Sequence, residues 1–216
     1  MTTAPLTERS PARAAWDKTG TVVVPGALER TRFEAIRAET LSRLERTVPY
    51  VREEATAHRD GSFASPVHCG FLPAGPELER LAYDKELLAA LRAATGLSRL
   101  VPRGGAAVVY REGDFQGLHT DTVKATITVG IALTSGLPSM GWAPGLRDAH
   151  PDRLAEVIAE HGLFPEGEGF TELGHPYADG SVRAFAGYNV PHWRRKHQGR
   201  VGALATLGTT SGRVCW

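Results

Sequence analysis

Apolar residues before Gly96 recur mostly at helical spacing. They keep this spacing at positions 30–48 and again at 76–96, and the second segment begins at a proline and ends at a glycine, as helices often do. A short apolar strand is expected at 19–28, whereas positions 58–76 are rich in Gly, Ser and Pro, which is typical of a loop. The N-terminal half of the chain is therefore expected to be mainly helical.

From residue 100 onward the pattern becomes that of β-strands. Short β-branched or apolar runs, separated by Gly, Pro and Asp, predict strands, and one helical segment at 151–162 interrupts them. The predicted strands lie at 105–110, 126–133, 181–190 and 200–210. Helices followed by a run of strands indicate an α+β domain whose strands form a sandwich or jelly roll, with the helices packed outside.

One domain, 1–216, is expected, because a single core can accommodate a chain of this length. It divides into a helix-rich segment, 1–97, and a strand core, 98–216, which contains an inserted loop and helix at about 136–180. Connections of that length are often lids or binding loops. We therefore expect the insertion to shape access of the substrate.

Composition and charge argue against several classes of protein. The formal net charge of +1 gives no electrostatic reason to bind nucleic acid or an anionic membrane surface. The first fifteen residues are polar, and no apolar run approaches the ~20 residues needed to span a bilayer. Cys69 and Cys215 lie outside any metal-ligand spacing and are expected to be free thiols. We expect a soluble cytoplasmic protein, and its oligomeric state stays open.

The strongest chemical signal is the triplet His119-Thr120-Asp121, which stands between two predicted strands. In an extended chain, residues i and i+2 face the same side, so His119 and Asp121 can offer an imidazole nitrogen and a carboxylate oxygen to one ion. Two histidines and one carboxylate on one face of an octahedron leave three positions open. Non-haem Fe(II) oxygenases use those positions for co-substrate and O2.

Two other His-x-Asp triplets are interpreted structurally. His58 and Asp60 precede a Gly-Ser turn that no predicted strand follows. His150 and Asp152 stand where a helix is expected to begin, and a helix N-terminus favours a carboxylate.

The third metal ligand should come from a later strand, distant in sequence but close in space. His192 follows an extended run and stands where a strand is expected to end. His197 lies in the charged stretch 194–200, which is typical of a solvated turn. We therefore predict His192 as the third ligand.

The motif-bearing segment 110–200 resembles the 2-oxoglutarate/Fe(II)-dependent oxygenase superfamily. Tyr110, Gly113, His119 and Asp121 stand at the spacing of the Y-x-x-G…H-x-D segment of prolyl-4-hydroxylase-like enzymes. The later histidine and the Gly-Arg pair at 199–200 resemble the H…G-x-R element of the superfamily. The N-terminal segment WDKTGTVVVPGAL is more similar to the phytanoyl-CoA dioxygenase branch. Two features depart from the pattern, since the spacing from His192 to Arg200 is slightly short and a Gly-Gly-Glu-Thr element is absent.

This resemblance implies a double-stranded β-helix, or jelly-roll, core that binds Fe(II) through His119, Asp121 and His192, with 2-oxoglutarate as co-substrate and O2 as oxidant. It assigns Arg200 to the distal carboxylate of 2-oxoglutarate, because a guanidinium pairs bidentately with a carboxylate. Tyr110 is a further candidate hydrogen-bond donor to the same group. Related halogenating enzymes lack the ligating carboxylate, so the presence of Asp121 favours hydroxylation, with desaturation, epoxidation and ring formation left open. A small molecule, such as an intermediate of natural-product biosynthesis, is the expected substrate.

Three alternatives stay open at this stage. One is a cupin-like metal enzyme that does not use 2-oxoglutarate. Another is a non-catalytic binding module on the same scaffold, since a fold does not dictate a function. The third is a zinc hydrolase with two histidine ligands and a carboxylate, although the sequence holds no HExxH-like segment.

Overall fold

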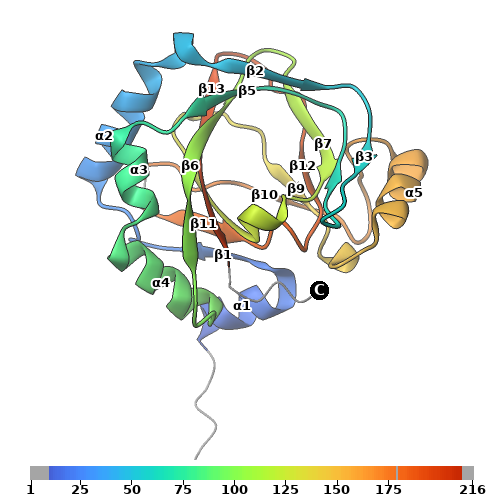
Figure 1. Cartoon of the computed structure of the whole chain (residues 1–216), viewed down its shortest axis with the longest axis horizontal. Coiled ribbons are helices and arrows are strands. Elements are labelled where there is room, and N and C mark those ends of the chain that lie inside the picture. The colour runs from blue at the N-terminus through green and yellow to red at the C-terminus, as the bar shows by residue number, and fades with distance from the viewer. Residues whose placement is uncertain (1–9, 179, 211–216) are drawn as a thin grey trace, which may run out of the picture.

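The computed structural model describes residues 10–178 and 180–210, and its centre is an antiparallel sheet that curls into a barrel (Figure 1). The strand order is β1-β11-β8-β13-β6-β5-β7-β12-β9-β10, and β2 pairs with β5. These strands are β1 (Thr21–Val24), β2 (Val48–Arg52), β5 (Val67–Pro73), β6 (Val101–Tyr110), β7 (Phe115–His119), β8 (Ile127–Ala132), β9 (Met140–Trp142), β10 (Thr171–Leu173), β11 (Val182–Phe185), β12 (His192–Arg194) and β13 (Gly202–Thr210). A separate two-stranded sheet joins β3 (Thr56–Ala57) to β4 (Phe63–Ala64). The predicted jelly-roll architecture is confirmed.

Helices cover the barrel on two sides (Figure 1). The α-helices are α1 (Pro11–Thr19), α2 (Arg30–Leu41), α3 (Pro76–Ala82), α4 (Lys85–Thr95) and α5 (Pro151–His161), and the short 3-10 helices are η1 (Leu44–Arg46), η2 (Val123–Ala125) and η3 (Pro144–Leu146). Helices α1 to α4 lie along one side, and α5 lies across the barrel from α2 and α3. The main apolar core fills the space between α1 to α4 and the layer of β1, β11, β8 and β13.

Strand β8 shows how the two faces of this layer differ. Val129 and Ile131 are fully buried in the core beneath the helices. Thr128 points the other way and lines a pocket inside the barrel. Every residue of β8 is buried, because helices cover one face and the barrel interior lies on the other. The alternation therefore brings the Thr128 side chain to the pocket from a strand that is otherwise apolar.

Two helical predictions needed correction. The segment predicted as one helix at 76–96 is two helices, because the side chain of Asp84 accepts a hydrogen bond from the Leu87 backbone N–H at 2.8 Å and begins α4. The segment predicted as a helix at 30–48 leaves the α-helix after Leu41, and its end joins β2. Strand β2 forms because it pairs with β5, a contact that helical periodicity does not reveal.

The large sheet takes strands from both sides of the predicted boundary between 97 and 98. Residues 1–97 supply α1 to α4, but they also supply β1, β2 and β5 to the large sheet. The insertion at 136–180 contains α5, as expected, together with β9 and β10, which extend the layer of β7 and β12. The predicted insertion therefore contributes to the barrel wall.

Two findings bear on the expectations from composition. In the described ranges, no helix has both the length and the apolar character needed to cross a membrane. Cys69 is a buried free thiol of β5, and burial raises its pKa to about 12. Cys215 lies outside the described residues.

Candidate metal centre

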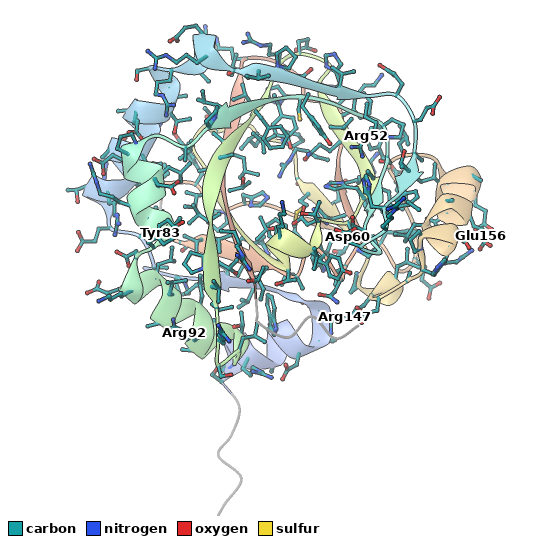
Figure 2. All side chains as sticks on the ribbon, in the orientation of Figure 1. Arg52, Asp60, Tyr83, Arg92, Arg147 and Glu156 are labelled. Carbon is teal, nitrogen blue, oxygen red and sulfur yellow. The ribbon has the colours of Figure 1, made fainter. Side chains whose placement is uncertain are left out.

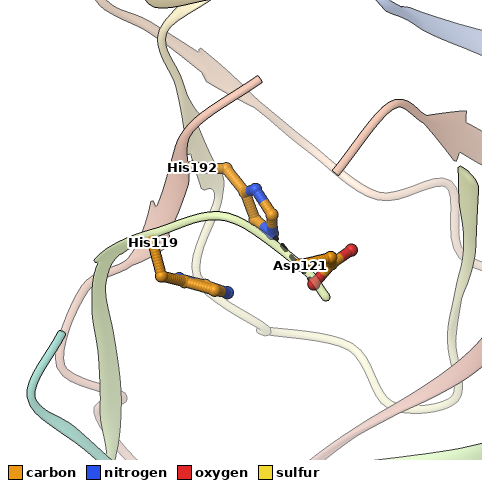
Figure 3. A group of neighbouring side chains, drawn as sticks. All are labelled: His119, Asp121 and His192. Atoms are coloured by element: carbon orange, nitrogen blue, oxygen red, sulfur yellow. Dashed lines mark ion pairs between the residues drawn. The ribbon is translucent and has the colours of Figure 1, made fainter. Parts of the chain in front are cut away.

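Three side chains converge at one end of the barrel (Figure 3). His119 is the last residue of β7, Asp121 follows two positions later, and His192 opens β12 directly opposite His119 in the antiparallel ladder. One ligand atom from each lies within 4.8 Å of the other two, and His192 Nε2 is 3.8 Å from Asp121 Oδ1. Among the residues that the structure describes, no other group of three His, Cys, Asp or Glu residues meets in this way.

Backbone carbonyls fix the orientation of both imidazoles. His119 Nδ1 lies 2.8 Å from the carbonyl oxygen of Gly117, and His192 Nδ1 lies 3.1 Å from that of Val190. A carbonyl only accepts hydrogen bonds, so each Nδ1 carries the proton and each Nε2 keeps its lone pair. Metal-binding histidines are commonly held by such a contact at the second nitrogen. Both rings are therefore prepared to bind an ion through Nε2.

The carboxylate of Asp121 is held from two sides. Thr128 Oγ1 donates a hydrogen bond to Asp121 Oδ2 at 2.5 Å, and the Asp121 backbone N–H donates to the Gly187 carbonyl at 2.8 Å. A Cβ atom at Gly187 would come within 2.0 Å of Asp121 Oδ2. Only a glycine at that position leaves the carboxylate in its present place.

His192 is the most buried of the three ligands. It is 6% exposed, and its ring centroid lies 5.4 Å from that of Phe185 and 5.7 Å from that of Trp142. Burial, followed by the neighbouring His119, lowers the pKa of His192 to about 4. The imidazole is consequently neutral at pH 7, which is the form that binds a metal.

The three groups open into a pocket of about 470 Å³ inside the barrel. This volume falls within the usual range for small-molecule sites. Its lining consists of Tyr50, Arg52, His58, Ser62, Ala64, Phe71, Val108, Gln116, His119, Thr120, Asp121, Thr122, Ala125, Thr128, His192, Leu204, Thr206 and Gly208. Asp121 is the one acidic side chain among these described lining residues.

The other predicted site residues lie in different places. Tyr110 is fully buried, and its hydroxyl donates to Gln116 Oε1 at 2.6 Å, so it contacts a side chain that lines the pocket. Arg200 is exposed on a turn outside the pocket, where its carbonyl contacts His197 Nε2. This location does not support the predicted role of Arg200 as an anchor for a buried carboxylate, because its guanidinium is in contact with water.

Sequence reasoning missed Arg194, which was assigned with its neighbours to a solvated turn. That interpretation was wrong for Arg194 and His197, which are only 3% and 2% exposed. Arg194 stands two residues after His192 on β12, opposite Gln116 of β7, and so faces the barrel interior. The alternation of strand side chains was the signal that could have found it: if His192 points inward, the residue two positions later does too.

Arg194 is a buried cation without a carboxylate partner among residues 10–178 and 180–210. Its Nη1 donates to the Pro138 carbonyl, its Nη2 lies 2.9 Å from His175 Nε2, and its Cζ lies 5.3 Å from the ring centroid of Tyr110. Burial, followed by the charge of Arg194, holds the pKa of His175 well below its ordinary value, so His175 is neutral and accepts the hydrogen bond. Buried charges are normally paired, and the partners of this guanidinium in the described ranges are neutral. Arg194 is not itself among the residues that line the pocket.

No protein-family model matches the chain, and no curated protein is similar enough in sequence to match it. Solved structures are similar in fold. HygX from Streptomyces hygroscopicus, with nickel and 2-oxoglutarate bound, aligns with a TM-score of 0.64 at 17% identity over 96% of this chain and 87% of its own. SnoK, a non-haem α-ketoglutarate-dependent carbocyclase from nogalamycin biosynthesis, aligns with a TM-score of 0.65 at 18% identity over the same shares.

A prolyl-4-hydroxylase from Pseudomonas putida aligns with a TM-score of 0.58 at 15% identity, over 92% of this chain and 96% of its own. The alignments cover nearly the whole of each chain, so the likeness extends from the barrel to the helices around it. With its ligand triad at one end of a jelly-roll barrel, the chain has the fold of the 2-oxoglutarate/Fe(II)-dependent oxygenases.

Proposed function

We propose that the protein is an Fe(II)- and 2-oxoglutarate-dependent dioxygenase that hydroxylates a small molecule. The observation that carries this proposal is the convergence of two imidazoles and one carboxylate within 4.8 Å, with both Nδ1 atoms held by carbonyls. Two histidines and a carboxylate with open positions fit non-haem Fe(II). The fold likeness to HygX, which was solved with 2-oxoglutarate and with hygromycin B, supports both the co-substrate and a small-molecule substrate.

We assign the distal carboxylate of 2-oxoglutarate to Arg194, in place of Arg200. Arg194 stands two residues after His192 on β12, so it would bind the carboxylate of the co-substrate that is remote from the ion. Gln116 lines the pocket opposite Arg194 in the ladder, and it already accepts a hydrogen bond from Tyr110. The Tyr110 hydroxyl can turn from Gln116 to the same carboxylate, which keeps the role predicted for it.

The side chains of the site would position the reactants and hold protons in place. His119 and His192 would bind the ion through Nε2, while each Nδ1 keeps its proton and donates it to a backbone carbonyl. Thr128 keeps one oxygen of Asp121 occupied, which presents the other oxygen to the ion. When bound, Fe(II) with 2-oxoglutarate and O2 supplies oxidative decarboxylation of the co-substrate and oxidation of a substrate C–H bond. Because Asp121 takes a coordination position, hydroxylation is the proposed outcome.

An anaerobic titration tests this function. Fe(II) and 2-oxoglutarate added together should produce a weak visible charge-transfer band, and admission of O2 should yield succinate. His119→Ala should abolish both signals, whereas His150→Ala, a matched change in a His-x-Asp triplet outside the site, should leave them intact. A protein that binds Fe(II) but gives neither band nor succinate would refute the use of 2-oxoglutarate and favour the cupin-like alternative.

A further inference from the structure

Strand β2 passes over the outer region of the pocket and contributes two side chains to it. Tyr50 and Arg52 stand at alternate positions, so both face the pocket. Arg52 pairs with Val67 of β5, and Val67 pairs with Gln116 of β7. Adjacent strands lie ~4.8 Å apart, so the backbone of Arg52 is only ~10 Å from that of Gln116 in the pocket wall.

The guanidinium of Arg52 has no carboxylate partner in the described ranges. Its Nη2 donates to the hydroxyl of Tyr50 at 3.0 Å, and its Cζ lies 5.8 Å from the centroid of the Tyr50 ring. In Figure 2, Arg52 and Asp60 both lie on the side of the barrel nearest α5. Asp60, however, is engaged by Ser62. The guanidinium therefore keeps donors for a ligand at the mouth of the pocket.

Charge balance indicates what that ligand should be. If the proposed function holds, the two charges of Fe(II) and the one of Arg194 are matched by Asp121 and the two carboxylates of 2-oxoglutarate. Arg52 is then a positive charge without a counterpart, and Asp121 is the one acidic group among the described lining residues. An anionic substrate would complete this balance.

The wall beside Arg52 is apolar. The rings of Tyr50 and Phe71 meet edge to face with centroids 5.1 Å apart, and Val108 and Leu204 also line the pocket. Aromatic and aliphatic side chains of this kind bind the apolar body of a ligand. The pocket therefore offers a cation, an apolar wall and the candidate metal ligands to one ligand.

The β3–β4 hairpin is tied to the loop that carries Asp121. The Phe63 backbone N–H donates to Thr120 Oγ1 at 2.8 Å, and the Thr120 N–H donates to the Phe63 carbonyl at 2.8 Å. The hydroxyl of Tyr188 donates to the Asp60 carbonyl at 2.6 Å. These contacts keep the rim at a fixed distance from the metal ligands, which suits a site that must hold a substrate in one position.

We propose that the substrate is a small amphiphilic anion whose carboxylate or phosphate group binds Arg52 while its apolar body lies against Tyr50 and Phe71. This inference rests on the proposed function, because the charge balance counts the ion and the co-substrate. Arg52 would then determine specificity by binding the group opposite the carbon to be oxidised. A guanidinium binds both carboxylate and phosphate, so the two sources must be distinguished by experiment.

Calorimetric titration of protein loaded with Ni(II), which does not turn over, and 2-oxoglutarate provides the test. The probes are phenylacetate, phenyl phosphate and the neutral phenylacetamide. One of the anions should bind roughly tenfold tighter than the amide, and Arg52→Gln should remove that difference. The tighter anion identifies carboxylate or phosphate. Arg59→Gln is the matched control, because Arg59 is exposed on the same segment and does not line the pocket.

Three results would overturn the inference: no binding of either anion up to about 10 mM, equal binding of the amide and both anions, or equal losses in Arg52→Gln and Arg59→Gln. The loading of 2-oxoglutarate is titrated first, without any phenyl probe. A failure of the proposed function therefore shows as absent 2-oxoglutarate binding. A failure of the present inference shows only in the second titration, with 2-oxoglutarate already bound.

Discussion

Replacing Arg194 with Gln removes the buried cation of the barrel while keeping a side chain that can hydrogen-bond. In the native chain this guanidinium is 3% exposed, contacts the Pro138 carbonyl and His175, and lies beneath Tyr110 at 5.3 Å. A carboxylate bound there would lose its contacts with water, and the guanidinium would have to balance its negative charge. Arg194→Gln should therefore weaken 2-oxoglutarate binding steeply.

The magnitude follows from the burial of the pair. Removing one partner of a buried, charge-assisted pair costs ~2–5 kcal/mol, because the other charge is left uncompensated. That cost corresponds to a loss of about thirtyfold to several-thousandfold in affinity. Fe(II) affinity should change little, since Arg194 is not among the three ligands. Arg194→Lys should recover some of the loss, because lysine keeps the charge but not the planar fork.

The assay is anaerobic titration of 2-oxoglutarate into the Fe(II)-loaded protein, followed by its charge-transfer band, with metal content measured in parallel. Arg200→Gln is the matched control and should bind 2-oxoglutarate as the native protein does, because Arg200 is exposed outside the pocket. A truncated co-substrate, 2-oxopentanoate, lacks the distal carboxylate. The native protein should strongly prefer 2-oxoglutarate to it, and Arg194→Gln should lose this preference.

The comparison of the two co-substrates also separates binding from folding. A variant that is merely destabilised loses affinity for both compounds, whereas loss of a carboxylate anchor affects only 2-oxoglutarate. If Arg194→Gln retains the native preference and Arg200→Gln loses it, the assignment to Arg194 is refuted and the anchor predicted from the sequence resemblance is restored.

Two further predictions concern the metal ligands. Gly187→Ala places a Cβ within 2.0 Å of Asp121 Oδ2, so it should displace the carboxylate and lower Fe(II) affinity by roughly ten- to a hundredfold, measured by equilibrium dialysis. Gly145→Ala is the control, because nothing lies within 4 Å of a Cβ at that position. Equal Fe(II) affinities of the two variants would contradict the argument. The pKa of His192 falls from 6.5 in the unfolded chain to about 4 in the fold, so the unfolded state takes up a proton first as the pH is lowered. The metal-free protein should lose up to roughly 3 kcal/mol of unfolding free energy between about pH 6.5 and pH 4, measured by urea denaturation, and His192→Gln should remove that component of the slope.

The sequence by itself determined the elements that depend on local signals. The helix predicted at 151–162 is confirmed as α5, because a proline begins it, a glycine ends it and its apolar residues keep helical spacing. Strands β6, β8, β11 and β13 followed from β-branched and apolar runs bounded by glycine and proline. The triplet at His119 was distinguished from two others because strands flank it, which is also local information.

The candidate ligands could be predicted from the sequence because strand geometry is regular. The i, i+2 alternation places His119 and Asp121 on one side, and a later strand end supplies His192. The same alternation, carried two residues further, predicts that Arg194 faces inward. The charged composition of 194–200 led instead to the prediction of a solvated turn, because runs of basic residues are usually exposed.

Only the tertiary structure decided which arginine is buried. Arg194 is inside because β12 pairs with β7 on one side and β9 on the other, so its side chain is enclosed by the barrel; Arg200 lies beyond the strand end. Likewise β2 exists because it pairs with β5, and that pairing brings Arg52 to the pocket. These partners are distant in sequence, and burial depends on what a neighbouring strand covers, so no local pattern of residues could fix either position.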